Sequence, residues 1–135
     1  MHDNHRMRIS RINPDGLHPT PGYSHITLVE AGRLAFLAGQ CPLDVTGTLV
    51  GPGDLPAQVD QVIANSLTAL QAAGATPEQV VRSVIYVVGE DLAAVWKQLL
   101  DSPLAPAFST ASTLLGVAKL GFTGQLVELD LTVAL

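Results

Sequence analysis

The C-terminal segment, residues 126–135, alternates between apolar and polar side chains over its whole length. The apolar positions are Val127, Leu129, Leu131, Val133 and Leu135, and the polar positions between them are Glu128, Asp130 and Thr132. Successive side chains of a β-strand point to opposite faces of the sheet. The segment is therefore predicted to be a strand with one buried face and one polar face, and the polar face carries Glu128.

Two other segments repeat apolar residues with the period of an amphipathic α-helix. The first covers residues 59–73, with Asp54 placed to cap its start and Gly74 placed to end it. The second covers residues 92–99, with Asp91 as its N-cap and a proline shortly after its end. Both helices are expected on one side of the sheet, opposite the polar face of the last strand.

Further segments are rich in β-branched and apolar residues and are predicted to be strands. They are residues 8–12, 25–30, 34–39, 79–88 and 112–120. A glycine-containing turn separates 25–30 from 34–39, which predicts that these two strands pair as a hairpin. The order β-β-β-α-β-α-β-β is that of an α+β domain in which two helices cover one face of a mixed sheet.

Length and composition indicate one domain that associates with itself. The chain suits a single domain over residues 1–135, in which residues 1–20 combine an N-terminal strand with an irregular lead-in rich in proline and glycine. A hydrophobic content of 47% is high for a chain of 135 residues, because a small domain has much surface to cover with polar groups. The sequence therefore predicts a homo-oligomer, in which another subunit covers the open sheet face.

Charge and hydropathy disfavour several classes of partner. The net charge is −5, and the seven lysines and arginines form no basic run, so no nucleic acid is expected to bind. No apolar run reaches the roughly 18 residues of a membrane span, and the N-terminus has no apolar signal-like segment. Cys41 is the sole cysteine, which rules out an intrachain disulfide. A cytoplasmic protein without a membrane partner is expected.

No cofactor is predicted. None of the four histidines lies at a metal-ligand spacing from a cysteine or a carboxylate, so no metal site is expected. The glycines of the 44–53 loop lack the Gly-Lys-Ser/Thr continuation of a phosphate loop. Cys41 has no nearby cation that would activate its thiol, and it is interpreted as a small buried hydrophobe.

Glu128 and Asp130 are the carboxylates with the most informative placement. At a strand rise of about 3.3 Å per residue they lie roughly 7 Å apart on one face. This spacing is compatible with solvated or interfacial charges, with a single functional glutamate, or with a paired-carboxylate hydrolase. The spacing alone leaves all three interpretations open.

Several short segments occur in a fixed order along the chain. They are residues 22–25 (GYSH), 37–44 (LAGQCPLD), the helical segment 58–74 with its AAGA end, 80–88, 114–120 (LLGVAKL) and 126–129 (LVEL). Together they resemble the RidA/YjgF family, small trimeric proteins also called L-PSP endoribonucleases, over about residues 20–135. The family pattern runs P-Y-S, V-S-G-Q-x-P-x-D, P-A-R-[ST]-x-V-x-V-x-x-L and V-E-[IV]-E. No single segment is specific, but the ordered set is.

The resemblance implies a chorismate-mutase-like α+β fold that assembles as a homotrimer with clefts between neighbouring subunits. In active members the cleft hydrolyses reactive enamines or imines to a keto acid and ammonia. The arginine of the P-A-R motif grips the substrate carboxylate as a bidentate fork. A glutamate on the last strand positions the attacking water, and a tyrosine and backbone groups near S-G-Q complete the site.

Only part of this site transfers to the chain. Tyr23, Gly39 and Glu128 fall on matching positions, whereas Ala38 replaces the serine of S-G-Q. The arginine position falls on Ser112 when the alignment is counted from the downstream motif, and no arginine occurs after Arg82.

The other residues near the motif do not restore the missing cation. Aligning Pro106-Ala107 with P-A-R gives Phe108 at the arginine position, and Leu114 occupies a position that is often cysteine. Lys119 alternates with Ser112 to the other strand face and is not expected to substitute.

The hydroxyl-rich stretch 109–113 (STAST) is therefore interpreted as the lining of a cleft mouth in place of the carboxylate clamp. Losing a bidentate arginine removes about 1.5–3 kcal/mol of charge-assisted contact. The predicted site comprises Glu128 as the catalytic, water-positioning residue and Tyr23, Ala38, Gly39, Ser112 and Thr113 as substrate-binding residues.

The sequence supports three hypotheses for the function. The cleft hydrolyses a small imine- or enamine-type metabolite other than a standard 2-iminocarboxylate, or imine deamination persists with weaker carboxylate binding. Alternatively, the scaffold is a non-enzymatic small-molecule-binding or interaction module. The acidic balance disfavours ribonuclease activity. Whether His25, Cys41 or an arginine such as Arg33 or Arg82 enters the cleft is left open by the sequence.

Overall fold

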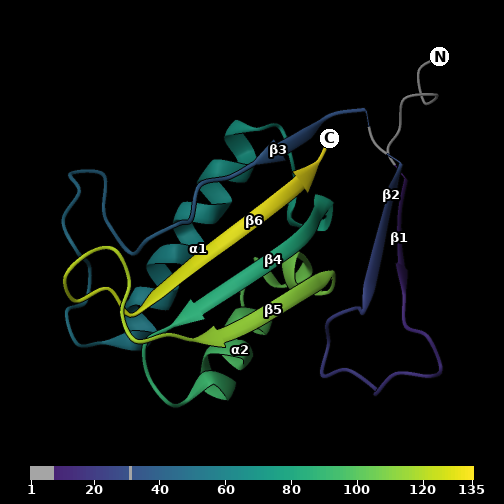
Figure 1. The fold of residues 1–135 in the computed structure, drawn as a ribbon. Coiled ribbons are helices and arrows are strands. Elements are labelled where there is room, and N and C mark those ends of the chain that lie inside the picture. Colours follow the sequence, from purple (N-terminus) through teal and green to yellow (C-terminus); the bar gives the residue numbers. More distant parts are fainter. Residues whose placement is uncertain (1–7, 31) are drawn as a thin grey trace.

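A four-stranded mixed sheet forms the centre of the structure, a computed structural model that describes residues 8–30 and 32–135 (Figure 1). Its strands, in spatial order, are β3 (Leu34–Phe36), β6 (Val127–Ala134), β4 (Val80–Val87) and β5 (Ala111–Gly116). Strand β4 runs parallel to β5 and antiparallel to β6, and β3 runs antiparallel to β6. The long strand β6 therefore lies inside the sheet with a hydrogen-bonded neighbour on each side.

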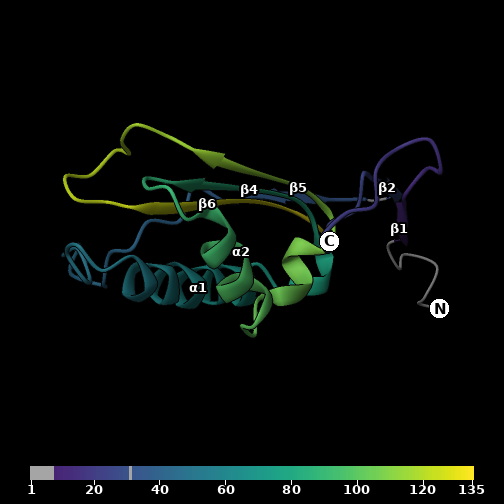
Figure 2. The ribbon, with the colours of Figure 1, turned by 90° about the horizontal axis from the view of Figure 1, so that it is seen from below.

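Two α-helices cover one face of this sheet and leave the other uncovered (Figure 2). They are α1 (Leu55–Ala72) and α2 (Leu92–Leu100), and short 3₁₀ turns η2 (Pro77–Gln79) and η3 (Ala105–Phe108) precede strands β4 and β5. This arrangement confirms the predicted α+β fold class. No helix in residues 8–30 or 32–135 is long and apolar enough to cross a membrane.

The predicted helix caps are confirmed. The Asp54 side chain accepts a hydrogen bond from the Ala57 amide at 3.1 Å, and Asp91 accepts one from the Ala94 amide at 3.1 Å. Gly74 follows α1 with a φ of 76°, a left-handed conformation that favours glycine at a helix end. These local contacts fix where the helices begin and end, and hence which side chains face the sheet.

The core lies between the helices and the sheet, and β6 contributes its whole apolar face. Val127, Leu129, Leu131 and Val133 are all 0% exposed. Their partners include Val59, Val62 and Leu70 of α1, Ile85 and Val87 of β4, and Leu99 of α2. Because every second residue of β6 is buried here, the residues between them must point to the uncovered face.

One predicted pairing is wrong. Strand β2 (Ile26–Glu30) does not form a hairpin with β3 but pairs antiparallel with β1 (Arg8–Ile12) in a separate two-stranded sheet. This two-stranded sheet projects from the end of the main sheet (Figure 1). A glycine turn signals where the chain can bend but not which strand lies beside which. Here β6 provides the neighbour of β3, with Ala35 opposite Val133.

Two predicted strands are also too long. Strand β5 ends at Gly116, so Lys119 lies in the loop before β6, and the alternation argument for its orientation does not apply. Strand β3 ends at Phe36, although residues 37–40 continue beside β6 through isolated contacts, such as the Gln40 amide to the Leu129 carbonyl at 2.6 Å. Strand β1 confirms the predicted N-terminal strand, and residues 1–7 of the lead-in lie outside the described residues.

The uncovered sheet face mixes polar side chains with exposed apolar ones. Leu34 and Phe36 of β3 are 50% and 75% exposed, and Leu115 of β5 is 41% exposed. Between them lie the polar residues of β6, including Glu128, as the alternation of the sequence predicts. The uncovered face therefore carries both the candidate site and apolar side chains that are exposed to solvent in a single chain.

Replacing Leu129 with alanine should test the importance of β6 for the core. The side chain is fully buried, so Leu129→Ala is expected to lower the free energy of unfolding by about 2–5 kcal/mol through lost burial and a residual cavity. Denaturant unfolding followed by circular dichroism measures this change. Val45→Ala, at a fully exposed loop position, serves as control and should stay within about 0.5 kcal/mol. A loss as small as the control's would show that β6 does not anchor the core.

Candidate active site

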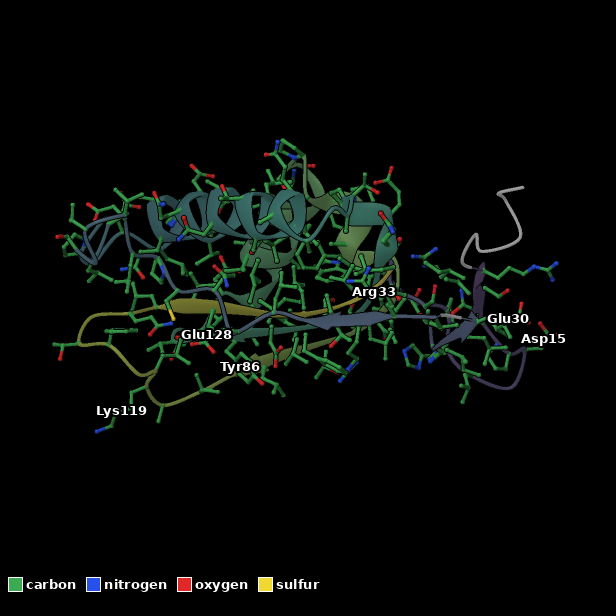
Figure 3. All side chains as sticks on the ribbon, turned by 90° about the horizontal axis from the view of Figure 1, so that it is seen from above. Asp15, Glu30, Arg33, Tyr86, Lys119 and Glu128 are labelled. Carbon is green, nitrogen blue, oxygen red and sulfur yellow. The ribbon has the colours of Figure 1, made fainter. Side chains whose placement is uncertain are left out.

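Glu128 is half-buried on the uncovered face of the sheet, directly opposite Tyr86 of β4 (Figure 3). Both side chains lie on the side away from the helices. The two neighbours of Glu128 along β6, Val127 and Leu129, are fully buried on the other side. The core side of β6 therefore fixes the direction in which the carboxylate points.

Two donors hold one oxygen of the Glu128 carboxylate. The Cys41 thiol donates to Glu128 Oε1 at 3.4 Å, and the Gln125 side-chain amide donates to the same oxygen at 3.1 Å. Gln125 is only 3% exposed and is itself fixed, because it also donates to the Val127 carbonyl and accepts from the Phe122 amide. Oε1 is thus saturated by rigid donors, while Oε2 has no hydrogen-bond partner among the described residues.

Gly39 provides the space for this carboxylate. A Cβ atom at Gly39 would lie 2.7 Å from the Glu128 carboxyl carbon and closer still to Oε2, nearer than any side chain tolerates. The segment is held there because Gln40 exchanges two backbone hydrogen bonds with Leu129, the residue after Glu128. Only glycine permits so close an approach of backbone and carboxylate. We call Glu128, Gly39, Cys41 and Gln125 the carboxylate site.

Burial and the adjacent carboxylate alter the chemistry of Cys41. Desolvation raises the pKa of the Cys41 thiol to about 11, and the hydrogen bond to Glu128 and its negative charge act in the same direction. The group is therefore a protonated thiol at neutral pH and serves as a hydrogen-bond donor. The interpretation of Cys41 as a buried hydrophobe is corrected in this respect, since the thiol is half-buried and contacts the glutamate.

Thr113 and Arg82 lie on the same sheet face as Glu128, but farther from its carboxylate. The Arg82 guanidinium donates to Thr113 Oγ1 at 2.7 Å. Arg82 lies opposite Thr132, four residues from Glu128 along β6, which corresponds to about 13 Å at the usual strand rise. Ala38 is exposed next to Gly39, with its carbonyl accepting from the Gln40 side chain.

The arginines left open by the sequence do not contact the carboxylate within one chain. Arg33 lies near the opposite end of the sheet from Glu128 in Figure 3, whereas Lys119 extends outward from the loop between β5 and β6. Neither Arg33 nor Arg82 makes an ion pair with Glu128 among residues 8–30 and 32–135.

Ser112 does not lie beside Glu128. It pairs with the fully buried Ser83, and the two hydroxyl groups hydrogen-bond on the helix side of the sheet. Thr113, the next residue, faces the uncovered side with Arg82. The two hydroxyls predicted to act together thus point to opposite faces, as adjacent residues of a strand must.

The hydroxyl-rich stretch has structural partners throughout. Ser109 donates to the Pro106 carbonyl at 3.0 Å, and Thr110 donates to the Val81 carbonyl at 2.9 Å. Ser112 Oγ lies within hydrogen-bond distance of the Phe108 and Thr110 carbonyls, at 3.2 and 3.1 Å. These hydroxyls satisfy backbone groups at the turn into β5, where the peptide chain cannot yet form a complete ladder.

Tyr23 and Ser112 meet at a second location, a cavity of about 340 Å³ between α2, the start of β5 and the lead-in loop. We call it the aromatic pocket, and its lining residues are Pro21, Tyr23, Ala93, Trp96, Ser112 and Leu114. His25 belongs to this region as well, because its ring lies edge-on to those of Tyr23 and His18. The structure therefore divides the predicted site residues between two faces of the sheet.

Sequence reasoning missed Gln125 and the pocket beside Trp96. Gln125 lies three residues before Glu128, a spacing at which a turn brings an amide back to the start of the strand, but glutamine alone is an unspecific signal. The helical spacing of residues 92–99 predicts that Trp96 faces the core, and it does pack edge-on against Phe108 at 6.0 Å between ring centroids. Trp96 also lines the pocket.

Comparison with known proteins identifies the family. The family model described as Endoribonuclease L-PSP matches residues 14–135. The chain belongs to the RidA/YjgF family. This confirms the resemblance given by the ordered motifs.

Individual proteins similar in sequence to this Rid protein support the family assignment. The RutC family protein slr0709 of Synechocystis is 35% identical over 117 residues, covering 83% of the chain and 86% of that protein. Protein DfrA of Myxococcus xanthus is 38% identical over 65 residues, so the matched part spans only about half of DfrA.

Solved structures show the same fold. The Rid family protein YyfB of Yersinia pestis, a protein of unknown function, is 35% identical with a TM-score of 0.83, covering 94% of the chain and 98% of YyfB. RidA from the Antarctic bacterium Psychrobacter sp. is 25% identical with a TM-score of 0.67, covering 93% of the chain and 99% of that protein.

Alkylation of Cys41 should report its contact with Glu128. With a thiol pKa of about 11, the thiolate fraction at pH 8 is small, so iodoacetamide is expected to modify the folded Rid protein at least ~50-fold more slowly than the denatured chain. The rate should keep rising with pH up to about 11. Mass spectrometry of quenched samples measures it.

The contact itself is tested with two charge-neutralising variants. Glu128→Gln removes the negative charge and the carboxylate acceptor, so it should lower the thiol pKa and speed alkylation. Asp130→Asn removes a carboxylate from the same strand face that has no bond to Cys41, and it serves as the matched control. Equal acceleration by both variants would contradict a specific contact.

Proposed function

We propose that this Rid protein is a homotrimer that hydrolyses a small, reactive imine- or enamine-type compound in clefts between its subunits. The observation that carries the proposal is the state of Glu128, whose Oε1 is held by two donors while Oε2 has no partner among the described residues. A carboxylate held in this way can accept a proton from water through a single, oriented oxygen. The carboxylate site supplies the residue that the reaction requires.

The chemistry is the addition of water to a carbon–nitrogen double bond. Glu128 Oε2 takes a proton from a water molecule as its oxygen attacks the imine carbon, and the imine nitrogen takes up a proton from solvent. Glu128 then returns its proton to the nitrogen of the tetrahedral amino alcohol, the C–N bond breaks as the hydroxyl group loses its proton to solvent, and a carbonyl compound and ammonia leave. Water is the only co-reactant. General-base catalysis of this kind contributes about 10²–10⁴-fold to the rate.

Assembly between subunits is favoured by where the side chains lie. Tyr23 and Ser112 face the helix side at the β5 edge, whereas Glu128 and Gly39 lie on the uncovered face, so one chain alone does not bring them together. The uncovered face also exposes Phe36, which favours burial against another copy. A cleft that joins the aromatic pocket of one protomer to the carboxylate site of the next uses both sets of residues.

Within this cleft each remaining residue has a role. Gly39 and Ala38 form the backbone beside Glu128 Oε2, where a substrate nitrogen or carbon can approach closely. Thr113 and Arg82 form the polar edge of the same face. The family's carboxylate-binding arginine position falls on Ser112 or on Phe108, neither of which carries a positive charge, so the favoured substrate has no carboxylate at that point.

The association state is a direct test. Sedimentation should give three times the 14.1 kDa chain mass, and Phe36→Asp should shift the protein towards monomers by placing a charge in the interface. Val45→Asp introduces the same charge in an exposed loop and should leave the trimer intact. A wild-type monomer at micromolar concentration would refute an inter-subunit site.

The hydrolytic role is tested by measuring imine decay. A neutral imine is generated from an amine by an amine oxidase, and a 2-iminocarboxylate is generated from an amino acid by an amino-acid oxidase. The protein should accelerate decay of the neutral imine, and Glu128→Gln should lower this acceleration by at least ~100-fold. Asp130→Asn, on the same face, should lower it less than about threefold, as expected for a residue outside the reaction.

Equal rates for wild type and Glu128→Gln would exclude this mechanism. Acceleration of the 2-iminocarboxylate alone would instead show that standard imine deamination persists without the arginine. Binding of small molecules without any acceleration would favour the non-enzymatic binding module, which the same scaffold supports.

A further inference from the structure

The aromatic pocket is walled by rings that the fold holds in place. The Trp96 indole nitrogen donates to the Pro21 carbonyl at 3.1 Å, which joins α2 to the lead-in loop. The rings of Tyr23 and Trp96 stand edge-to-face, 6.4 Å apart at 78°, and Trp96 packs in the same manner on the buried Phe108. The ring surfaces are therefore oriented before any ligand enters.

The polar groups at this pocket already have partners. The Tyr23 hydroxyl is hydrogen-bonded to His18 Nε2 at 2.7 Å, and the Trp96 N–H is used by Pro21. Ser112 Oγ is shared among the Ser83 hydroxyl and two backbone carbonyls. The walls that remain are almost entirely apolar, and no charged side chain is among the lining residues that the structure describes.

We infer that the aromatic pocket binds the uncharged aromatic or alicyclic ring of a small molecule, and that it selects ring-bearing imines without a carboxylate as substrates. The second half rests on the proposed function. A ring fits a cavity of about 340 Å³, in the size range of small-molecule sites, and can stack on Trp96 and Tyr23. A carboxylate entering here would lose its water and find no free donor, which is strongly unfavourable.

Trp96 gives a direct readout of binding, because it is the only tryptophan of the chain. Benzamide and benzoate are nearly equal in shape and differ in charge, so titrating each into the whole protein compares a neutral ring with an anionic one. Benzamide should change the Trp96 fluorescence with saturation, and its dissociation constant should be at least tenfold lower than that of benzoate.

Two substitutions on α2 locate the bound ring. Ala93 lines the pocket and Ala94 does not, yet both are exposed alanines of the same helix. Ala93→Leu should fill part of the cavity and weaken benzamide binding at least tenfold, whereas Ala94→Leu should leave it within twofold. Thermal unfolding of both variants checks that the fold is kept, and Leu114→Phe provides a second way to fill the pocket from β5.

The same variants separate the inference from the proposed function. The imine that an amine oxidase forms from benzylamine should be hydrolysed faster than the 2-imino acid formed from phenylalanine, and Ala93→Leu should remove this preference. Glu128→Gln should abolish hydrolysis while leaving benzamide binding unchanged. Binding without hydrolysis overturns the proposed function and, with it, the substrate preference, but it leaves the ring-binding half of the inference standing.

Benzoate binding as tight as benzamide binding, or benzamide binding indifferent to both Ala93→Leu and Leu114→Phe, overturns the inference. If Glu128-dependent hydrolysis of a small aliphatic imine is then still observed, the proposed function stands without it.

Discussion

The pairing of β6 with its two neighbours is the constraint on which the rest of the structure depends. The apolar residues of β6 complete the core under the helices. The side chains between them therefore face the uncovered side of the sheet. Glu128 is therefore not placed by a flexible loop. The burial of Val127 and Leu129 on either side of it fixes the strand, and the free energy of the core is what holds the carboxylate in position.

The carboxylate site also fixes the position of the Glu128 carboxyl group on this strand. Gly39 is brought against Glu128 because Gln40 bonds to the backbone of Leu129, and the buried Gln125 and the protonated Cys41 both donate to one oxygen. Such an arrangement leaves the two oxygens of one carboxylate unequal, one bound by the protein and one available. In the absence of a cationic partner among the described residues this inequality, rather than a neighbouring charge, distinguishes Glu128 from Asp130 on the same face.

The two sides of the sheet explain why the proposed site of this Rid protein depends on association. Strand alternation sends Ser112 and Thr113 to opposite faces, so no rearrangement of side chains unites the aromatic pocket with the carboxylate site inside one chain. Most hydroxyls of the stretch 109–113, which the sequence suggested as a ligand-binding lining, bond to the backbone at the entry to β5, and Ser112 is the member that also lines the aromatic pocket. The space that the stretch leaves for a ligand is an apolar cavity beside aromatic rings.

Local periodicity and short motifs were sufficient to predict part of this protein from its sequence. The alternation of residues 126–135, the caps Asp54 and Asp91, and the ordered segments of the family were enough for the α+β class, the direction of Glu128 and the family. The partner of β3, the donors on Glu128 and the use of the hydroxyls, including the pairing of Ser83 with Ser112, emerged only in the folded chain. The reason is physical: period and capping act within a few residues, whereas most of these contacts join segments that lie far apart in the chain and meet only once the core has formed.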